Sequence, residues 1–204
     1  FGRPDSRCCM LTKGIVIGLT GPTGGGKSSV AKELVALGCA VVDCDRIARQ
    51  VTDSCVPCLQ SLAEEFGSDI LQEGMLDRKL LAARAFASPE KTRKLNELTH
   101  PWILGETKAQ IQAALDAGKP FVVVDAPLLF EAGVDALCDE IMAVTVPFEK
   151  RLQRIMKRDH ISEELARARM AAQHPESWYE ERAGKVISGR LDDETLRSEL
   201  KAYL

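Results

Sequence analysis

Two features are missing from this 204-residue sequence, and each absence excludes a class of partner. No apolar stretch approaches the ~18 residues that a membrane-spanning helix needs, so we expect no membrane partner. Lys and Arg number 27 against 30 Asp and Glu, which gives a net charge of −3. A nucleic-acid-binding surface needs an excess of basic residues, so we expect no nucleic-acid partner.

A secretory signal is also missing, because residues 1–14 contain charged residues and no apolar core. The seven cysteines are odd in number and scattered, which is typical of free thiols in a reducing compartment. Cys55 and Cys58 have C-x-x-C spacing, but no second pair or nearby His completes a zinc site. We therefore expect a cytoplasmic protein.

The most informative feature that is present is the run Gly21–Ser28 (GPTGGGKS), which fits G-x-x-x-x-G-K-[S/T]. The apolar run 15–19 before it predicts a buried strand, and residues 29–37 have the apolar spacing of a helix. Glycines let a backbone wrap closely around phosphate, and loop amides at a helix N-terminus attract the anion. The sequence therefore predicts a P-loop that binds nucleotide phosphates.

Each side chain of this loop has a predicted role. We expect Lys27 to reach the β- and γ-phosphates of ATP, and the Ser28 hydroxyl to ligate Mg²⁺. The other nucleotide contacts expected on this segment are Gly21, Gly24, Gly25, Gly26 and Ser29.

Apolar runs alternate with helical patterns along the chain, which predicts an α/β fold with a parallel sheet. The strands are expected at 15–19, 40–42, 121–124, 141–146 and 185–188. Residues 46–115 are almost wholly helical in pattern and too long for a simple crossover, so we expect a helical subdomain beside the sheet, over about 46–118. Within it, Pro101 should kink or split the long helix expected over 90–115.

Serine and aspartate predict where several helices begin. Ser88 followed by Pro89 is typical of a helix start. Ser162 should cap another helix, and Asp192 or Asp193 should cap the last one.

Carboxylates follow the second and third expected strands, at the sheet edge where such folds bind ligands. A kinase that phosphorylates an alcohol needs a carboxylate to accept its proton. Asp43 and Asp45 could each face this cleft or cap the next helix, and the sequence leaves both readings open. Asp125 either holds Mg²⁺ through water or is simply a turn residue at the end of a strand. Glu131 likewise either belongs to the site or has no role in it, and the sequence does not decide between the two.

Three arginines, Arg151, Arg154 and Arg158, fall at i, i+3 and i+7 and share one helix face. Such a stripe is commonly a solvated surface, but beside a P-loop it predicts a cationic clamp on phosphates. Together with Arg169 on the next helix, this segment (151–175) is expected to form a lid. His100, directly before Pro101, is either structural or part of the site.

With these segments in view, the chain resembles the dephospho-CoA kinase family from about residue 14 to 204. The P-loop alone specifies only a superfamily, whereas Asp-x-Asp-x-x-Ala-Arg together with His-Pro and Pro-Leu-Leu-Phe-Glu is far more specific. The matching segments are Ile17–Ser28, Val42–Arg49, His100 with Pro101, Pro127–Glu131, Arg154–Asp159, and Arg169 with Gln173.

The resemblance implies that the chain phosphorylates the ribose 3′-hydroxyl of dephospho-CoA, with ATP as donor and Mg²⁺ as cofactor. Asp45 matches the catalytic carboxylate, Arg154 and Arg158 match the lid arginines, and Arg151 stands where Gln is common. Arg158 and Arg169 are expected to contact the nucleotide. The substrate contacts implied are Asp45, His100, Pro127, Leu128, Leu129 and Glu131.

The family fold implied is the three-layer α/β fold of P-loop NTPases, with a five-stranded parallel sheet. One kinase domain is expected over 10–204, with residues 1–9 as an extension ahead of it. Its core would span about 14–45 and 119–204, its helical CoA-binding subdomain 46–118 and its lid 151–175. We expect a monomer or a weak homo-oligomer.

The chain departs from the family pattern at four positions. Ser188 and Gly189 replace the usual Asp-Asn after the last strand, and Gly184 replaces an aspartate before it. Contacts of this segment with adenine are therefore open. The usual Gly after Asp45 is Cys55 here, so the local backbone is expected to differ.

Two other functions fit the P-loop. One is a kinase for another small nucleoside or nucleotide acceptor, which the sequence does not separate from the first. The other is a nucleotide-binding switch protein such as a GTPase. Guanine readers of that class use Asn-Lys-x-Asp, but the only asparagine is Asn96, followed by Glu97, so this class is disfavoured.

Overall fold

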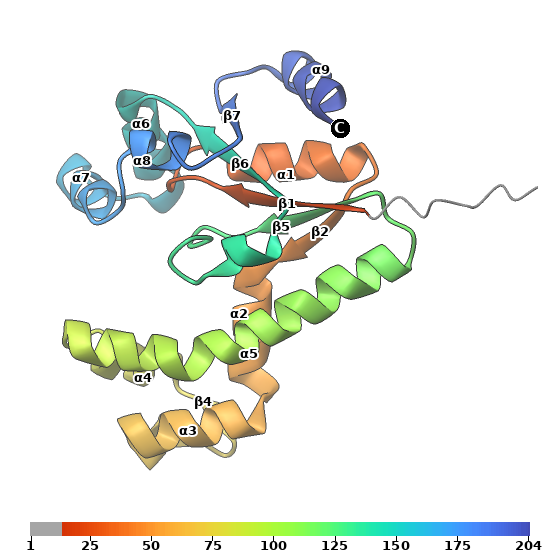
Figure 1. The fold of residues 1–204 in the computed structure, drawn as a ribbon. Helices are drawn as coiled ribbons and strands as arrows, with labels where there is room; N and C mark the ends of the chain where they lie inside the picture. The colour runs from red at the N-terminus through yellow and green to blue at the C-terminus, as the bar shows by residue number, and fades with distance from the viewer. Residues whose placement is uncertain (1–13) are drawn as a thin grey trace, which may run out of the picture.

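The computed structural model describes residues 14–204, so the extension expected at 1–9 lies outside the described residues. Its centre is a five-stranded sheet in the order β2-β5-β1-β6-β7 (Figure 1). Every neighbouring pair is parallel, which confirms the predicted parallel sheet. The strands are β1 (Ile15–Thr20), β2 (Ala40–Asp43), β5 (Phe121–Asp125), β6 (Glu140–Thr145) and β7 (Lys185–Ser188).

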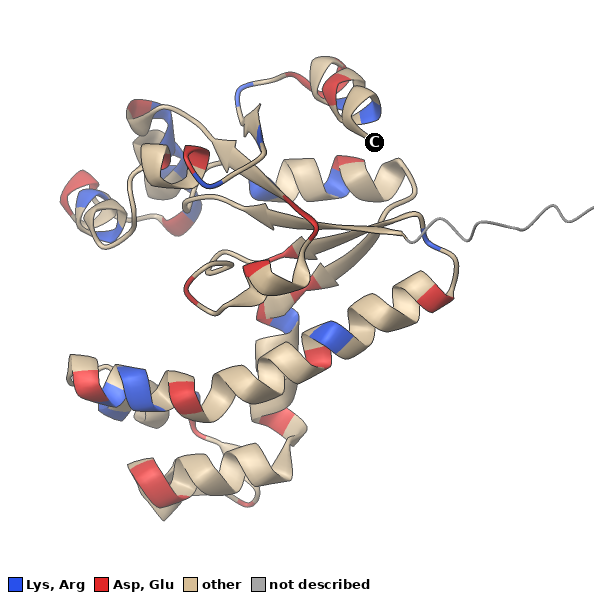
Figure 2. Cartoon of the chain, viewed as in Figure 1, with Lys and Arg blue, Asp and Glu red and all other residues tan. Residues whose placement is uncertain are grey.

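The inner strands are apolar because helices cover both faces of the sheet. In β1, Ile17 aligns with Val123 of β5, and Leu19 aligns with Met142 of β6. All four side chains are buried. Figure 2 accordingly shows charged residues over the helices and at strand ends, with almost none along the middle of the sheet.

One face of the sheet is covered by α1 (Lys27–Ala36) and α9 (Asp193–Tyr203). Leu34 of α1 and Leu200 of α9 are fully buried in this cluster. The last helix begins as expected, because the Asp192 carboxylate accepts the amide N–H of Thr195 at 2.9 Å.

The other face meets a group of four helices, which lies below the sheet in Figure 1. The helical pattern expected over this stretch is confirmed, except for a two-stranded antiparallel hairpin. Strands of two residues are too short to show a period-2 pattern, so this hairpin could not be predicted from the sequence. The elements are α2 (Cys44–Ser54), α3 (Val56–Phe66), the 3₁₀ turn η1 (Ser68–Ile70), β3 (Leu71–Gln72), β4 (Met75–Leu76), α4 (Arg78–Ala85) and α5 (Pro89–Asp116).

The long helix α5 begins where predicted, with Ser88 accepting the amide N–H of Lys91 and Pro89 at the first position. Of the two outcomes predicted at Pro101, a kink or a split, the split does not occur: α5 runs as one helix through that residue. Packing of α5 against α2, α3 and the sheet supplies contacts that offset the backbone hydrogen bond lost at a proline.

Between β5 and β6 lies the 3₁₀ turn η2 (Val134–Leu137), and beyond β6 the chain forms three helices. These are α6 (Phe148–Asp159), α7 (Glu163–Ala171) and α8 (Glu176–Glu180). They lie together at the carboxyl end of β6 (Figure 1), and α6 and α7 share a small apolar core. Ser162 caps α7 as predicted, whereas the five-residue α8 was too short to predict. Among the described helices, none has the length and apolarity that crossing a membrane requires.

Leu129 provides a test of this core. The side chain is 0% exposed and packs in the cluster between the sheet and the helical group, whereas Leu128 beside it is 58% exposed. Leu129→Ala should lower the free energy of unfolding by about 2–5 kcal/mol, and Leu128→Ala should change it by less than ~0.5 kcal/mol. Urea denaturation measures both, and equal effects would place Leu129 outside the core.

Candidate active site

The P-loop backbone lies directly on strand β6. Gly21 has φ +144°, and a Cβ built on it would lie 2.3 Å from the Val144 carbonyl oxygen. A Cβ on Gly25 would lie 2.7 Å from the same oxygen. Only glycine permits this approach, so the glycines fix where the loop lies relative to the sheet.

The amide groups of the loop divide into two sets. The Gly25 amide donates to the Pro22 carbonyl at 3.0 Å, and the Thr23 amide donates to the Gln173 side chain at 3.1 Å. Within residues 14–204, the amides of Gly24, Gly26 and Lys27 donate to no other protein group. These amides remain available to an anion at the N-terminus of α1.

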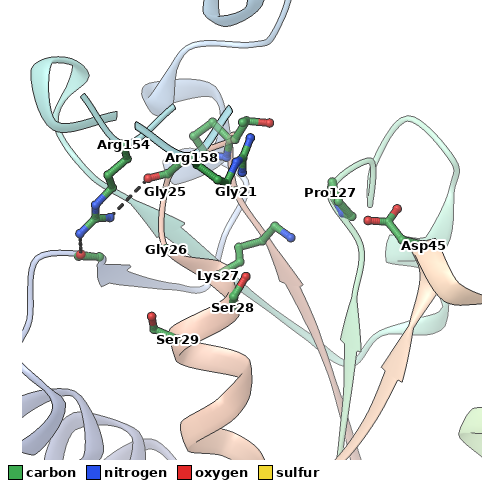
Figure 3. A pocket seen from close by; sticks show the side chains of 14 residues that line it. Gly21, Gly25, Gly26, Lys27, Ser28, Ser29, Asp45, Pro127, Arg154 and Arg158 are labelled. Carbon is green, nitrogen blue, oxygen red and sulfur yellow. Dashed lines mark hydrogen bonds between the residues drawn. The ribbon is translucent and has the colours of Figure 1, made fainter. Parts of the chain in front are cut away.

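The loop forms one wall of a cavity of about 560 Å³, a volume typical of small-molecule sites. Three cations, Lys27, Arg154 and Arg158, line it together with one acid, Asp45 (Figure 3). Its charge therefore suits a polyphosphate. The full lining is Gly21, Pro22, Thr23, Gly24, Gly25, Gly26, Lys27, Ser28, Ser29, Asp45, Pro127, Arg154, Arg158 and Gly189.

Lys27 is held at the floor of this cavity by an ion pair. Its Nζ lies 2.9 Å from Oδ1 of Asp125 at the end of β5, and both side chains are largely buried. Asp125 is therefore positioned to orient the Lys27 ammonium, in addition to any role near Mg²⁺.

The two aspartates after β2 have different environments. Asp43 caps α2, because its carboxylate accepts the amide N–H of Arg46 at 3.0 Å. Asp45 is two positions further along, as the second residue of α2, and lines the cavity opposite Lys27 (Figure 3). The sequence left both positions open for each aspartate; in the structure Asp43 caps the helix and Asp45 faces the cavity.

The environment of Asp45 raises the pKa of its carboxyl above the ordinary value. Partial removal of water by the surrounding protein is the largest cause. Lys27 lowers the pKa, while the negative charges of Asp43 and Asp125 raise it further. A raised pKa makes a carboxylate a better proton acceptor while it is still ionised at neutral pH.

The arginine stripe of α6 is divided between the cavity and the interior. Arg154 donates to the carbonyl oxygens of Gly24 at 3.3 Å and Gly189 at 2.7 Å (Figure 3). Arg158 lines the cavity further along the helix. Arg151 does not join them: it is 2% exposed and lies behind the loop, where its Nε donates to the Thr23 carbonyl. The prediction that all three clamp phosphate is therefore wrong for Arg151.

Arg169 lies outside the lining of the cavity. Its Nη1 donates to Oδ2 of Asp159 at 2.8 Å, and Arg158 donates to the same carboxylate at 2.6 Å and 2.9 Å. These hydrogen bonds, first of all that of Arg158, lower the pKa of Asp159. The carboxylate thus holds two arginines at the junction of α6 and α7.

A smaller, mostly apolar cavity of about 100 Å³ adjoins the first. Asp45 and Pro127 line both cavities, so the two meet at these residues. Half-buried His100 lines the small one, and burial lowers the pKa of its imidazole, which is therefore neutral at pH 7. The other lining residues are Cys44, Ala48, Ile103, Leu104, Ala126, Leu128, Ala132 and Val134.

Two residues of the expected substrate set lie outside both cavities. Leu129 is buried in the core, since its side chain points into the cluster under the sheet. The Glu131 carboxylate lies 3.5 Å from Nε2 of His174 at the surface.

Gly189 is a site residue that sequence reasoning marked only as a departure from the family pattern. Its carbonyl accepts from Arg154, and a Cβ built on it would lie 1.9 Å from the Gly25 carbonyl oxygen. The segment after β7 therefore lies against the back of the P-loop. Cys55, the other departure, has φ −79°, an ordinary backbone angle that requires no glycine.

The oxygen ligands near the loop fit a hard cation that binds mainly through phosphate. Ser28 supplies a hydroxyl beside Lys27, and Asp125 supplies a nearby carboxylate. In the described part of the chain, no cluster of three or more His, Cys, Asp or Glu could hold a metal alone. This donor set suits Mg²⁺, which keeps several waters and uses substrate phosphates as ligands.

Comparison with known proteins extends the resemblance over almost the whole chain. The sequence profile of the dephospho-CoA kinase family matches residues 15–193. A dephospho-CoA kinase of Corynebacterium glutamicum is 42% identical over 180 residues, which cover 87% of this chain and 90% of the relative. One of Bacillus licheniformis is 41% identical over 182 residues, covering 88% and 90%.

Solved structures of kinases and related proteins are also similar to this chain. A crystal structure of a Thermus thermophilus protein has a TM-score of 0.77 at 33% identity, covering 93% of this chain and 96% of that one. The dephospho-CoA kinase of Campylobacter jejuni has a TM-score of 0.69 at 28% identity, covering 92% and 94%. Shikimate kinase of Acinetobacter baumannii, at 16% identity and a TM-score of 0.54 over 95% and 94%, shares the fold. The predicted P-loop kinase fold is confirmed.

The contact between Gly189 and the loop can be tested with a matched pair of glycines. Gly189→Ala should weaken Mg-ATP binding about tenfold or more, because overpacking strain of ~1–3 kcal/mol would act on the P-loop. Gly184→Ala is the control, since its Cβ would meet no atom nearer than 3.8 Å. Calorimetric titration with Mg-ATP measures both. Equal affinities would contradict the assignment of Gly189.

Proposed function

The chain belongs to the dephospho-CoA kinase family, and we propose that its two adjoining cavities hold the two substrates of that family's reaction. The reaction transfers the γ-phosphate of ATP to the ribose 3′-hydroxyl of dephospho-CoA, which gives coenzyme A. In this proposal the large cationic cavity takes the triphosphate of ATP, and the small apolar cavity takes part of dephospho-CoA.

The observation that carries the proposal is the position of Asp45. Its carboxylate lies where the two cavities meet, opposite Lys27 (Figure 3). An alcohol that enters from the apolar side reaches the end of the triphosphate only at this junction. Holding both groups there turns a collision between two substrates into a step within one complex.

The residues of the junction divide the work of phosphoryl transfer. Asp45 accepts the proton of the attacking hydroxyl and directs its lone pair at phosphorus. Lys27 contacts the β- and γ-phosphates, held in place by Asp125. Arg154 and Arg158 balance the negative charge that spreads over the transferring group and the departing ADP.

Mg²⁺ completes this proposal as the cofactor. Ser28 would bind it directly and Asp125 would bind it through water. When bound, the ion neutralises part of the phosphate charge.

The two flanking parts of the fold have separate proposed roles. Helices α2 and α5 supply Ala48, His100 and Ile103 to the small cavity, which supports residues 46–118 as the CoA-binding subdomain. Arg158 and Arg169 converge on Asp159 where α6 meets α7, which supports residues 151–175 as a lid. A phosphate group could take over either arginine as the lid closes.

We also propose that the protein works in the cytoplasm. The cysteines that the structure describes are free thiols: Cys39, Cys44, Cys55, Cys58 and Cys138. Free thiols persist in a reducing compartment, which supports this location.

The proposed activity is tested by mixing the pure protein with Mg-ATP and dephospho-CoA and following products by mass spectrometry. The expected products are coenzyme A and ADP in equal amounts. Shikimate and adenosine serve as control acceptors and should gain no phosphate. Phosphorylation of a control acceptor with no coenzyme A formed would overturn the proposal.

The role of Asp45 predicts a loss of turnover without a loss of nucleotide binding. Asp45→Asn should reduce kcat by about 10²-fold or more, since that is the usual contribution of a positioned base. Asp43→Asn is the matched control, because Asn also caps a helix and this residue does not line the cavity. Steady-state rates and Mg-ATP titration separate the effects, and comparable rates for the two variants would remove Asp45 from its role.

The raised pKa of Asp45 sets the acid side of the pH profile. Protonation removes the base, so kcat/KM should fall as pH falls through that pKa, at a pH above its ordinary value of 3.8. Asp43→Asn should keep this acid limb, and the residual activity of Asp45→Asn should lack it. An acid limb that persists in Asp45→Asn would assign it to another group.

A further inference from the structure

Thr23, at the tip of the P-loop, has all three of its polar groups occupied from the lid side. Its amide N–H donates to Oε1 of Gln173 at 3.1 Å. Its hydroxyl accepts from Nε2 of the same side chain at 2.9 Å. Its carbonyl accepts from Nε of Arg151 at 3.0 Å.

Gln173 therefore contacts Thr23 with both ends of its amide. One end holds the backbone and the other holds the side chain, so the two hydrogen bonds together fix the orientation of the peptide between Pro22 and Thr23. The following amides, those of Gly24, Gly26 and Lys27, are the ones left free for an anion. The direction in which these N–H groups point depends on the orientation of the two peptide groups that flank Thr23.

A buried arginine supports this contact from behind. Arg151 is 2% exposed, and its Nη1 lies 2.5 Å from Oε1 of Glu176. Its Nη2 lies 3.4 Å from Oε1 of Gln173, so the arginine contacts both Gln173 and the Thr23 carbonyl. The carboxylate of Glu176 neutralises the charge of Arg151, which offsets the desolvation cost of burying the guanidinium.

The contact joins parts of the chain that local sequence does not connect. Gln173 lies between α7 and α8, and Arg151 lies in α6, whereas Thr23 follows β1. The loop is thus held on one side by β6 through its glycines and on the other by the segment that ends the lid.

From this geometry we propose that Gln173 is a positioning residue for the nucleotide: it holds Thr23 so that the free amides of the P-loop keep their phosphate-binding arrangement. This rests on the proposed function, because it takes the nucleotide to be the occupant of the large cavity. Gln173 itself lines neither cavity, so it acts through Thr23.

The first test replaces Gln173 by methionine, which keeps the length of the side chain and removes both hydrogen bonds. Gln173→Met should weaken Mg-ADP binding by about tenfold, the loss expected for two neutral hydrogen bonds. It should raise KM for ATP similarly and leave KM for dephospho-CoA within about twofold. Gln112→Met is the control, because Gln112 donates a hydrogen bond to Asp116 on an exposed face of α5. This variant should bind Mg-ADP like the unaltered protein.

The second test uses Thr23→Val, which removes the hydroxyl that Gln173 contacts and keeps the amide. It should weaken Mg-ADP binding by about threefold. In the double variant the losses should not multiply, because both changes break the same contact. If Gln173→Met does not fold, Thr23→Val carries the test alone, and unchanged affinity then overturns the proposal.

Two results contradict the proposal directly. One is Mg-ADP affinity of Gln173→Met within twofold of the unaltered protein. The other is an equal rise in KM for both substrates, which indicates a general structural loss. Titration with Mg-ADP needs no turnover. A failure to form coenzyme A would therefore overturn the proposed function, while the Mg-ADP affinities of the variants would still test the role of Gln173.

Discussion

The site depends on one constraint, the close contact between the P-loop backbone and strand β6. Gly21 and Gly25 approach the Val144 carbonyl so closely that no Cβ would fit. This contact holds the loop so that the amides of Gly24, Gly26 and Lys27 are unpaired within residues 14–204, and unpaired amides at a helix N-terminus attract an anion. In the proposed function, the cations and the carboxylate act on phosphates that this loop would hold.

The surrounding chain adds charges to that cradle from several elements. Lys27 comes from α1, Asp45 from α2, and Arg154 and Arg158 from α6. Rigid strand ends and helices hold these groups before substrate arrives, so little reorganisation is needed during the reaction. In the proposed function, the apolar cavity next to Asp45 would bring the acceptor to the same point.

Local patterns in the sequence predicted the strands, three helix caps and the P-loop, because each depends on neighbouring residues. Side-chain direction was harder to predict. Asp43 and Asp45 differ by two positions, and the exact start of α2 decides which one caps the helix and which one faces the cavity. Arg151 shares a face with Arg154 by spacing, yet the return of the chain at Glu176 buries it. Such contacts between distant segments leave no local pattern to read.

The central claim is that triphosphate and acceptor alcohol meet between Lys27 and Asp45. A crystal structure with dephospho-CoA, Mg²⁺ and a non-hydrolysable ATP analogue tests it most directly. The account predicts a γ-phosphate in contact with the P-loop amides and Lys27, and a ribose 3′-oxygen within hydrogen-bond distance of the Asp45 carboxylate. A 3′-oxygen bound away from Asp45, or a triphosphate outside the glycine loop, would contradict it.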